Sequence, residues 1–325
     1  MALVMQSGAD GFDFSMLREV PQRVVNAGPV SFPFDLVDVE IFGESYSLDF
    51  PDLDANSGLA ALLRDGRALG VMGDDIRFAG NGLLQSGTAT LLLGFEDEEP
   101  EFMLAGVSVE VSRLIAVGRT ATTQDDSALL AELLRGDDVM LGNDDYATDD
   151  VLNGRGGRDV LGGYAGDDRL AGGRGDDVLL GGAGRDTLEG GAGQDILLAD
   201  AGNDILRGGF GNDVLAALMG AHGLTGGKGR DIFGFGAGSI GSVIRDFRDG
   251  TDRIAFDIEG LTFADLRITQ LGPDVVRVAG DGFAFRVAGL RVEDLGRADF
   301  LFGTAAQDSV AASLDAFLDG WAYSV

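Results

Sequence analysis

The stretch GGRGDDVLLGGAGRDTLEGGAGQDILL, residues 172–198, contains the same nine-residue pattern three times in succession. Each nonapeptide opens with a glycine-rich run, has aspartate at its sixth position and has leucine at its eighth. Repetition at a fixed short period is typical of solenoids, in which one unit cannot bury its apolar face without its neighbours. The interval therefore predicts a repeat architecture.

The same register extends well beyond this stretch. Aspartates recur every nine residues at Asp150, Asp159, Asp168, Asp177, Asp186, Asp195, Asp204 and Asp213, and after His222 the series resumes at Asp231. An apolar residue follows each of these positions by two, from Leu152 to Leu224 and then Phe233. From Gly157 to Gly229, a glycine precedes each position of the series by two. Three columns in one register indicate a shared structural unit.

Each column has a physical role. Glycine tolerates positive φ and close backbone approach, so the glycine-rich runs are predicted to be turns. The segment that follows each aspartate is short and alternating, which predicts a brief strand with its leucine facing inward. Two units of turn and strand complete one coil, and coils stack at the strand spacing of about 4.8 Å. Aspartates of alternate repeats should therefore form a column along each edge.

Such columns require a counter-ion. Two carboxylates 4 Å apart repel each other by up to about 4 kcal/mol in the dielectric of a protein surface. Carboxylates and turn carbonyls form an all-oxygen site, which suits Ca²⁺ better than Zn²⁺ or Cu²⁺. With one histidine and no cysteine, the chain cannot build a closed zinc site from nitrogen and sulfur ligands.

The repeats resemble those of the RTX (repeats-in-toxin) family, whose nonapeptide GGxGxDxUx binds calcium. The matching segments are GGRGDDVLL at 172, GGAGRDTLE at 181, GGAGQDILL at 190, GGFGNDVLA at 208 and GGKGRDIFG at 226. The resemblance implies a parallel β-roll, with each Ca²⁺ held between two loops two repeats apart. The implied ligands are the aspartate carboxylates and the carbonyl oxygens of the first four loop positions.

Carried onto this chain, the resemblance divides the aspartates between two edges. One edge has Asp159, Asp177, Asp195, Asp213 and Asp231, and the other has Asp150, Asp168, Asp186 and Asp204. The glycines implied to offer carbonyl oxygens are Gly172, Gly173, Gly175, Gly181, Gly182, Gly184, Gly190, Gly191, Gly193, Gly208, Gly209, Gly211, Gly226, Gly227 and Gly229.

Three repeats depart from the pattern. ALMGAHGLT at 217 has His222 in place of the acid, which predicts a missing or weakened ion next to Asp204 and an exposed histidine in a decayed repeat, with a functional histidine as the alternative. ADAGNDILR at 199 keeps its fourth-position glycine and Asp204 and is expected to bind. GDDVMLG at 136–142 resembles a first repeat, but its register slips by three residues, so Asp138 and Asp145 stay open as ligands.

The predicted fold is all-β: a parallel β-roll with a β-rich N-terminal domain and a C-terminal β cap. The expected boundaries are 1–121 for the N-terminal domain, 122–136 for a linking or capping helix, 137–234 for the roll, 235–303 for the cap and 304–325 for an export-signal region. The helix follows from a capping box at its start and Gly136 as a stop. Within the first domain, LAALLRDGRAL at 59–69 suggests a short helix.

Two flanking regions carry further resemblances. DFRDGTDRIAF at 246–256 and ADFLF at 298–302 resemble the cap of serralysin-type RTX proteins, in which the C-terminal end is an uncleaved signal for the type I export machinery. We expect the cap to be a small antiparallel region. Asp246, Asp249 and Asp252 are expected to be solvated turn acids, with a further ion as the alternative. NGLLQSGTATLLLGF at 81–95 resembles a module at the front of many bacterial RTX proteins.

Composition narrows the partners and the location. The chain has 54 acidic and 24 basic residues, a net charge of −30, which argues against nucleic acid and anionic lipid as partners. No apolar stretch reaches the length of a membrane span, and the N-terminus lacks the basic region of a secretory signal peptide. Together with the family resemblance, this predicts a bacterial protein that is secreted, extracellular or at the cell surface.

The sequence favours a non-catalytic role. HExxH and GxSxG are absent and His222 is the single histidine, so zinc-protease and serine-hydrolase chemistry is excluded. We expect a calcium-binding protein that folds outside the cell and acts structurally or adhesively at the cell surface or matrix, with itself or a surface glycan as partner. The alternative is a secreted enzyme or glycan-binding protein whose active domain is residues 1–121, with acids such as Asp38, Glu40, Glu44 or Asp49 in a glycosidase site.

Overall fold

The computed structural model describes the backbone of the strands between Leu3 and Glu110, and residues 136–142, 149–303 and 305–306. The chain forms two compact units, residues 1–39 with 46–142, and residues 40–45 with 143–325. The predicted helix at 122–135, Asp145, and most of the export-signal region lie outside the described residues, as do the side chains of Asp38, Glu40, Glu44 and Asp49. No helix of the described segments is long and apolar enough to cross a membrane.

The strands of the first part of the chain are β1 (Leu3–Gln6), β2 (Arg23–Asn26), β3 (Val30–Phe32), β4 (Val37–Ile41), β5 (Glu44–Leu48), β6 (Leu53–Ala55), β7 (Ser57–Leu62), β8 (Ala68–Phe78), β9 (Leu84–Glu96), β10 (Glu99–Glu110) and β11 (Val139–Leu141). Strands β2, β7, β8, β9, β10 and β1 pair in that order and antiparallel, and β11 pairs parallel to β1. The short helix predicted at 59–69 is wrong, because β7 and β8 form a hairpin in which Ala61 lies opposite Leu69. Hydrogen bonds to neighbouring strands here outweigh the helix propensity of leucine and alanine.

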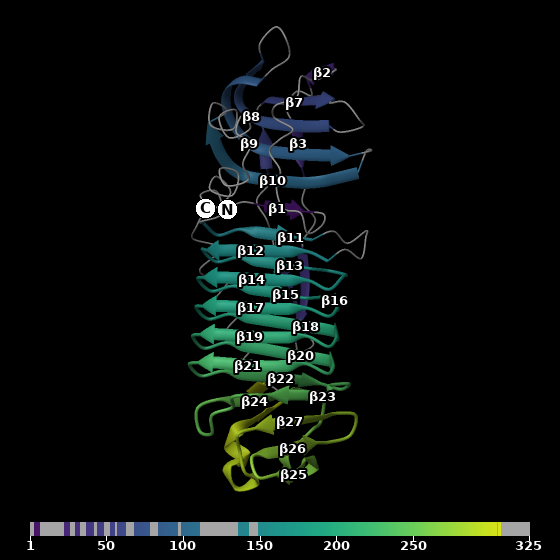
Figure 1. The fold of residues 1–325 in the computed structure, drawn as a ribbon, viewed down its shortest axis with the longest axis vertical. Helices are drawn as coiled ribbons and strands as arrows, with labels where there is room; N and C mark the ends of the chain where they lie inside the picture. The colour runs from purple at the N-terminus through teal and green to yellow at the C-terminus, as the bar shows by residue number, and fades with distance from the viewer. Residues whose placement is uncertain are drawn as a thin grey trace. The chain divides into compact units, whose positions relative to one another are not determined.

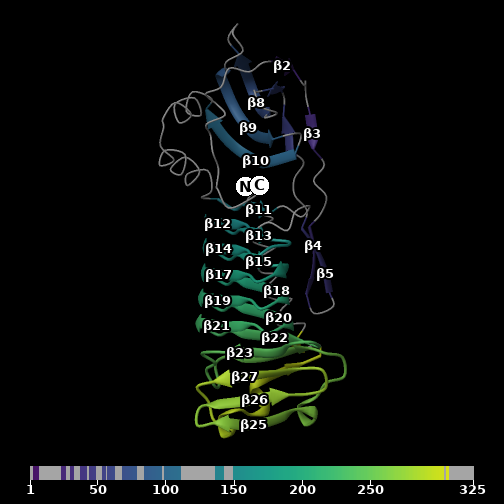
Figure 2. The same ribbon diagram turned by 45° about the vertical axis from the view of Figure 1, so that its right-hand side comes forward.

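The second unit contains the roll. Its strands are β12 (Val151–Gly156), β13 (Val160–Gly162), β14 (Arg169–Arg174), β15 (Val178–Leu180), β16 (Ala183–Gly184), β17 (Thr187–Ala192), β18 (Ile196–Gly202), β19 (Ile205–Phe210), β20 (Val214–Gly220), β21 (Gly223–Lys228), β22 (Ile232–Gly236), β23 (Ile240–Ile244) and β24 (Arg253–Asp257). Strands β12, β14, β17, β19, β21 and β23 form one parallel sheet, and β13, β15, β18, β20, β22 and β24 form the other. The chain alternates between the sheets down the stack, which gives about six turns of a β-solenoid (Figures 1 and 2).

Apolar residues of both sheets meet in the centre of the roll. Within the nonapeptides, each strand pairs in parallel with the strand eighteen residues further on, so that Leu170 lies beside Leu188 and Leu179 beside Leu197. The inward residues are at most 1% exposed: Leu152, Leu170, Leu188, Leu206 and Leu224 from one sheet, and Leu161, Leu179, Leu197, Leu215 and Phe233 from the other. Full burial of a leucine contributes about 1.5–3 kcal/mol, and only the stack provides it.

The glycines of the loops are required for two different reasons. A Cβ added to the first glycine of a repeat would strike the aspartate of its own loop, 2.2 Å from Asp177 Oδ2 in the case of Gly172. The fourth position adopts positive φ in most repeats and touches the preceding loop on the same edge. At Gly175 φ is 119°, and an added Cβ would lie 1.7 Å from the carbonyl oxygen of Gly157. The pattern GGxG therefore reports close packing within and between loops.

The region after the roll is only partly the antiparallel cap that the sequence predicts. Strands β25 (Arg267–Gly272), β26 (Val275–Ala279) and β27 (Ala284–Ala288) are antiparallel. However, β27 pairs parallel to β23, and β28 (Phe300–Phe302) pairs parallel to β24, so both sheets of the roll continue into the cap. Three 3₁₀ helices, Phe263–Asp265, Val292–Asp294 and Arg297–Asp299, connect these strands. Phenylalanines replace the leucine columns, and Phe235 stacks on Phe285 with ring centroids 3.9 Å apart.

Candidate metal centre

Two ladders of buried aspartates run along the edges of the roll. On edge A, which contains Asp159, Asp177, Asp195, Asp213 and Asp231, the backbone N–H of each of the first four donates to the Oδ1 atom of the aspartate eighteen residues later, at 2.9 to 3.1 Å. On edge B, which contains Asp150, Asp168, Asp186 and Asp204, the same bonds measure 2.7 to 2.9 Å. The two predicted columns are therefore present, with the pairing that an eighteen-residue coil requires.

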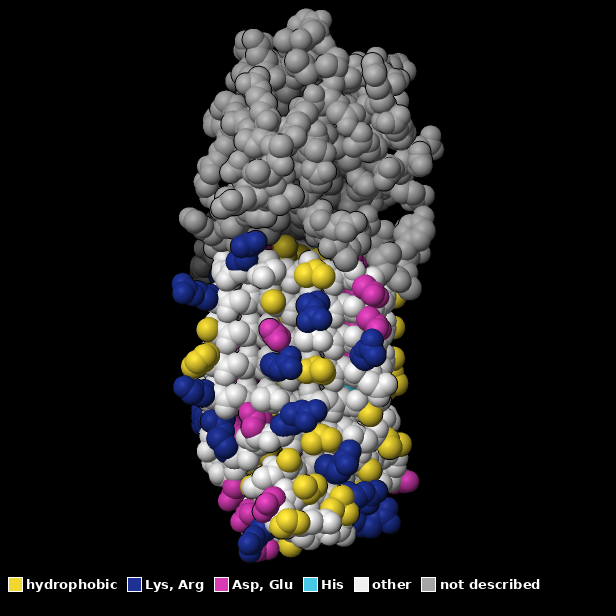
Figure 3. Space-filling view, viewed as in Figure 1, with side chains coloured by type: hydrophobic (Ala, Val, Ile, Leu, Met, Phe, Trp, Pro, Cys, Tyr) yellow, Lys and Arg dark blue, Asp and Glu magenta, His cyan; other side chains and the backbone are white. Residues whose placement is uncertain are grey.

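These nine carboxylates are inside the molecule. Each residue is at most 2% exposed, and lysine and arginine are more prominent than acidic side chains on the face of the roll in Figure 3. The Oδ2 atoms of Asp168, Asp186, Asp195 and Asp213 are buried and accept no hydrogen bond. A buried carboxylate oxygen without a partner is costly, and this cost is relieved by a proton or by a cation.

The pKa values of the ladder aspartates reflect this burial. Burial, followed by the charges of Asp177 and Asp213, raises the pKa of Asp195 to about 8. Burial likewise raises the pKa of Asp168 and Asp213 to about 7 and that of Asp186 and Asp231 to about 6. In each case the next aspartate of the same ladder adds to the effect. The ladders are thus strained while they carry negative charge alone.

The Oδ2 atoms without hydrogen bonds face small spaces beside the first glycines of the loops, which we call cradles. Backbone carbonyl oxygens form the other side of these cradles. A Cβ added to Gly163 would lie 2.3 Å from Asp168 Oδ2 and 2.7 Å from the carbonyl oxygen of Gly181. On edge A, a Cβ at Gly208 would have the same relation to Asp213 Oδ2 and to the Gly226 carbonyl oxygen, at 2.3 and 2.7 Å. Each cradle therefore combines one aspartate with the first glycine of the next loop on the same edge.

The donor set fits a hard cation. In the described part of the chain, no three histidine, cysteine or acidic side chains converge on one point, so an ion between two loops needs carbonyl oxygens to complete its coordination. Carboxylate and carbonyl oxygens in flexible number and geometry are the ligands that Ca²⁺ prefers. Some other loop carbonyl groups point toward the next loop instead of into a cradle. Those of Gly173 and Gly175 point at Gly191 and Gly193 on edge A.

The departure at residue 222 has a different outcome from the one predicted. His222 is buried, at 2% exposed, so the expectation of an exposed histidine is wrong. Its Nδ1 atom lies 2.9 Å from Asp204 Oδ2, and its Nε2 atom contacts the carbonyl oxygen of Met219. The backbone N–H of His222 donates to Ser242 Oγ at 3.0 Å. Imidazole and hydroxyl groups therefore continue the edge B ladder where the carboxylates end.

Edge B also loses its open cradles near this histidine. The first positions of the last two loops are Ala199 and Ala217, which lie beside each other in β18 and β20 and are fully buried. The equivalent position in the preceding loop is Gly181, where a Cβ would lie 2.7 Å from Asp186 Oδ2. A methyl group thus takes the space that other loops leave open, which weakens the expectation that the repeat at 199 binds an ion.

The turn acids after the repeats are not all solvated as expected. Asp249 is exposed, but Asp246 accepts hydrogen bonds from the N–H groups of Gly226 and Gly227 at 2.9 and 2.8 Å. Asp252 is buried and accepts the Asp231 N–H at 3.1 Å, so it is the next member of the edge A ladder. The signal for Asp252 is an acid two residues before a buried Ile254, but it follows Asp231 by 21 residues and so falls outside the nine-residue register.

Two further acids occupy the same kind of position. Asp299 precedes β28 and Asp138 precedes β11, and both are buried, at 3% and 0% exposed. The N–H of Gly296 donates to Asp299 Oδ2 at 2.7 Å. An aspartate directly before a short apolar strand is thus a recurrent feature of this chain, also outside the nonapeptides.

Comparison with known proteins gives one family match. The RTX calcium-binding nonapeptide repeat, in four copies, matches residues 144–179 and 180–215. No curated protein matches the chain. Among solved structures, the extracellular lipase LipA from Serratia marcescens is similar with a TM-score of 0.32 and 17% identity, over 52% of this chain and 37% of the lipase.

A second similar structure is a subunit from an epimerase. The AlgE6R3 subunit from the Azotobacter vinelandii mannuronan C5-epimerase matches with a TM-score of 0.22 and 28% identity, over 40% of this chain and 80% of the subunit. The chain thus spans little more than a third of the length of the lipase and most of that subunit. The nonapeptides between residues 144 and 215, which form most of the roll, are RTX calcium-binding repeats.

Proposed function

We propose that this chain is a secreted calcium-binding protein whose roll folds outside the cell when Ca²⁺ neutralises the two aspartate ladders. One observation carries the proposal. Buried Oδ2 atoms of Asp168, Asp186, Asp195 and Asp213 accept no hydrogen bond, although each carboxylate is held in place through its Oδ1 atom. A side chain fixed through one oxygen, with the other directed at a carbonyl-lined cradle, is organised for a cation.

The aspartates and glycines of the repeats have distinct roles in this proposal. The Oδ1 atoms tie each coil to the one before it, the Oδ2 atoms and the first-glycine carbonyl oxygens provide ligands, and the glycines keep the cradles free of side chains. When bound, Ca²⁺ supplies positive charge that removes the repulsion within each ladder. Because a site of this kind exists only in the folded coil, binding free energy becomes folding free energy.

Calcium concentration then decides where the roll folds. Extracellular calcium modules typically have dissociation constants of about 10⁻⁴–10⁻³ M, far above cytosolic concentrations. Each tenfold excess of Ca²⁺ over the dissociation constant of one site adds about 1.4 kcal/mol to the stability of the folded state. We infer that the repeats stay unfolded inside the cell, which suits type I export, and fold after release.

We further propose a structural or adhesive role at the cell surface or matrix, without catalysis and with self-association or a surface glycan as the contact. The single histidine, His222, is enclosed by Asp204 and Met219, which supports the absence of histidine-based chemistry. Exposed apolar side chains near the ends of strands β19 and β20, such as Phe210 at 60% and Met219 at 51%, offer contact points for a second copy.

Circular dichroism and calorimetry of the full chain test the calcium proposal. Calcium is expected to raise the β content of chelator-treated protein, whereas equal concentrations of Mg²⁺ are expected to have a much smaller effect, because Mg²⁺ demands rigid octahedral geometry. Identical spectra in chelator and in millimolar calcium would refute folding on calcium. Light scattering with and without calcium tests self-association.

A screen of glycosides and polysaccharides tests the absence of catalysis. If a substrate is turned over, and if activity disappears on substitution of Asp38, Glu40, Glu44 or Asp49, the N-terminal region is an enzyme and the roll is its export and folding module. Binding of a glycan without turnover would instead favour the adhesive role. Both experiments use the secreted, calcium-loaded protein.

A further inference from the structure

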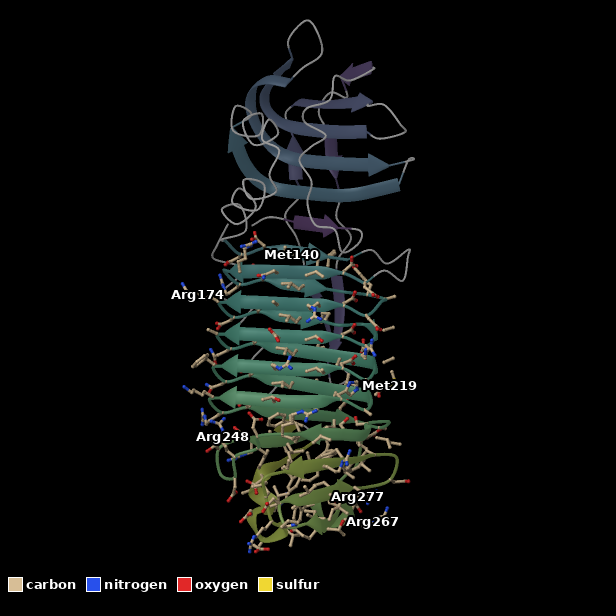
Figure 4. All side chains as sticks on the ribbon, in the orientation of Figure 1. Met140, Arg174, Met219, Arg248, Arg267 and Arg277 are labelled. Carbon is tan, nitrogen blue, oxygen red and sulfur yellow. The ribbon has the colours of Figure 1, made fainter. Side chains whose placement is uncertain are left out.

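The last loop of edge A holds a cationic side chain of the chain itself. Arg248 Nη2 donates to the Gly229 carbonyl oxygen at 2.6 Å, to Asp252 Oδ1 at 2.9 Å and to Asp231 Oδ2 at 3.1 Å. Its Nε atom donates to Asp252 Oδ2 at 3.3 Å. One guanidinium group thus contacts two carboxylates and a loop carbonyl at once, and Figure 4 shows Arg248 and Met219 at opposite edges of the roll.

The oxygen atoms around this guanidinium come from ladder positions. Asp231 is the sixth residue and Gly229 the fourth residue of the repeat GGKGRDIFG, and Asp252 is the next aspartate of the edge A ladder. A Cβ at Gly226 would lie 2.4 Å from Asp231 Oδ2, as at the first glycines of the repeats before it. The loop therefore keeps the glycine and aspartate positions of the repeats before it.

The contrast with those earlier repeats is the partner of the carboxylate. The Oδ2 atoms of Asp195 and Asp213 accept no hydrogen bond, whereas Asp231 Oδ2 receives one from Arg248. The turn that contains Arg248 contacts the loop at a second point, because the Asp246 carboxylate accepts hydrogen bonds from the N–H groups of Gly226 and Gly227. Two side chains of the turn at 246–252 therefore contact this loop. The Asp246 carboxylate accepts hydrogen bonds from its N–H groups, and the Arg248 guanidinium group donates to its oxygen atoms.

We propose that Arg248 is a resident cation that takes the place of Ca²⁺ at the C-terminal end of edge A. The inference rests on the proposed calcium binding by the earlier repeats. A guanidinium group stays charged at all accessible pH values and offers several donors in a fixed plane. The junction between the last nonapeptide and the cap is therefore assembled without calcium, and the number of ions on edge A is one lower than the number of acidic loops would allow.

The proposal predicts that removal of the guanidinium group creates a calcium site. In Arg248→Ala, the carboxylates of Asp231 and Asp252 and the Gly229 carbonyl oxygen are retained and their cation is lost. The calcium content of the full chain, measured by equilibrium dialysis and elemental analysis, is expected to rise by one ion per chain relative to the unaltered protein. At limiting calcium, the variant is expected to unfold at a lower denaturant concentration than the unaltered protein, and saturating calcium is expected to reverse this loss.

Two matched variants serve as controls. Arg248→Lys keeps a positive charge at the same place and is expected to bind no additional ion. Arg207→Ala removes an arginine from the outer face of the roll, where it pairs with the exposed Glu189 at 3.0 Å, and is also expected to leave the calcium content unchanged. A gain of one ion in Arg207→Ala would show that any loss of positive charge raises calcium binding, and would overturn the proposal.

The remaining outcomes are equally decisive. If Arg248→Ala folds in calcium and binds the same number of ions as the unaltered protein, Arg248 does not stand in for Ca²⁺. If the variant fails to fold even in millimolar calcium, the ion cannot replace the guanidinium group, which also contradicts the proposal. If the unaltered protein itself binds no calcium, the proposed function fails, and that result is distinct from the other two.

Discussion

The backbone N–H of Asp177 donates a hydrogen bond to the Oδ1 atom of Asp195, 3.0 Å away and eighteen residues further along the chain. Asp195 therefore has two separate tasks in the roll. One carboxylate oxygen fastens the coil that precedes it, and the other, Oδ2, is buried without a hydrogen bond. Structural and ligand roles are thus combined in a single side chain and can be separated by mutation.

Asp195→Asn tests this separation. Asparagine keeps an oxygen acceptor for the Asp177 N–H but removes the negative charge, so the calcium-free roll is expected to become more stable. Calcium binding is expected to weaken at two neighbouring ions, because each loop serves two sites. Calorimetry gives the affinity and stoichiometry, and circular dichroism in chelator gives the extent to which the calcium-free roll is folded. Asp249→Asn, in an exposed turn, is the control, and unchanged binding by Asp195→Asn would contradict the ligand role.

Gly175→Ala tests the close packing of the loops. Its φ of 119° and the 1.7 Å approach of an added Cβ to the Gly157 carbonyl oxygen predict a loss of about 3 kcal/mol or more, since left-handed strain and steric overlap add. Chemical denaturation in saturating calcium measures the change. Gly272→Ala, where an added Cβ meets nothing within 4 Å, is expected to change stability by less than about 0.5 kcal/mol. Equal effects of the two substitutions would show that the loops can separate.

The stability of the calcium-free roll should fall as pH rises. The pKa values of Asp195, at about 8, and of Asp168 and Asp213, at about 7, are raised from 3.8 by burial. The folded state therefore favours the protonated carboxyls, and its advantage is lost as pH rises from about 4 to about 8. Circular dichroism of the protein in chelator across this range measures the loss of the folded roll.

Calcium should reverse that pH dependence. Because ligand carboxylates must release their protons to bind the ion, calcium affinity is expected to rise over the same pH window. Calorimetry at several pH values measures this, and Asp195→Asn is expected to show a shallower dependence of calcium-free stability on pH. A calcium-free roll that gains stability between about pH 5 and about pH 8 would contradict the burial of these charges.

On edge B, restoring the acid and the first glycine of the repeat at 217 tests whether the methyl group of Ala217 prevents calcium binding. His222→Asp alone returns the acid to the repeat at 217 but leaves the buried methyl group of Ala217 at the first position. We expect this substitution to leave the calcium content unchanged, and we expect the addition of Ala217→Gly to raise it by one ion per chain. Elemental analysis after equilibrium dialysis distinguishes the two. A gain with His222→Asp alone would show that the methyl group does not block the cradle.

Much of the roll could be predicted because its determinants are local and repeated. Glycine, aspartate and leucine each recur in one register, so the two edges, the inward leucines and the parallel stack follow from the period and from the properties of each residue type. The prediction failed where the partners are distant. Residues 59–69 have a helical composition, but 59–62 and 68–69 lie in β7 and β8, since neighbouring strands supply the hydrogen bonds.

The tertiary structure, and not the sequence, shows which groups surround an individual side chain. His222 breaks the sequence pattern, and only the folded coil shows that it lies between Asp204 and Met219 instead of in solvent. Asp252 lies 21 residues after Asp231, and only strand pairing shows that it continues the same ladder.

The sequence by itself determined the repeating coil and the columns of acids, because a periodic pattern permits one periodic arrangement of buried and turn-forming residues. Only the tertiary structure decided which charges meet which partners. A contact such as that of Arg248 with Asp231 and Gly229 depends on how the turn at 246–252 folds back on the last loop. The spacing of residues along the sequence does not predict this fold of the turn.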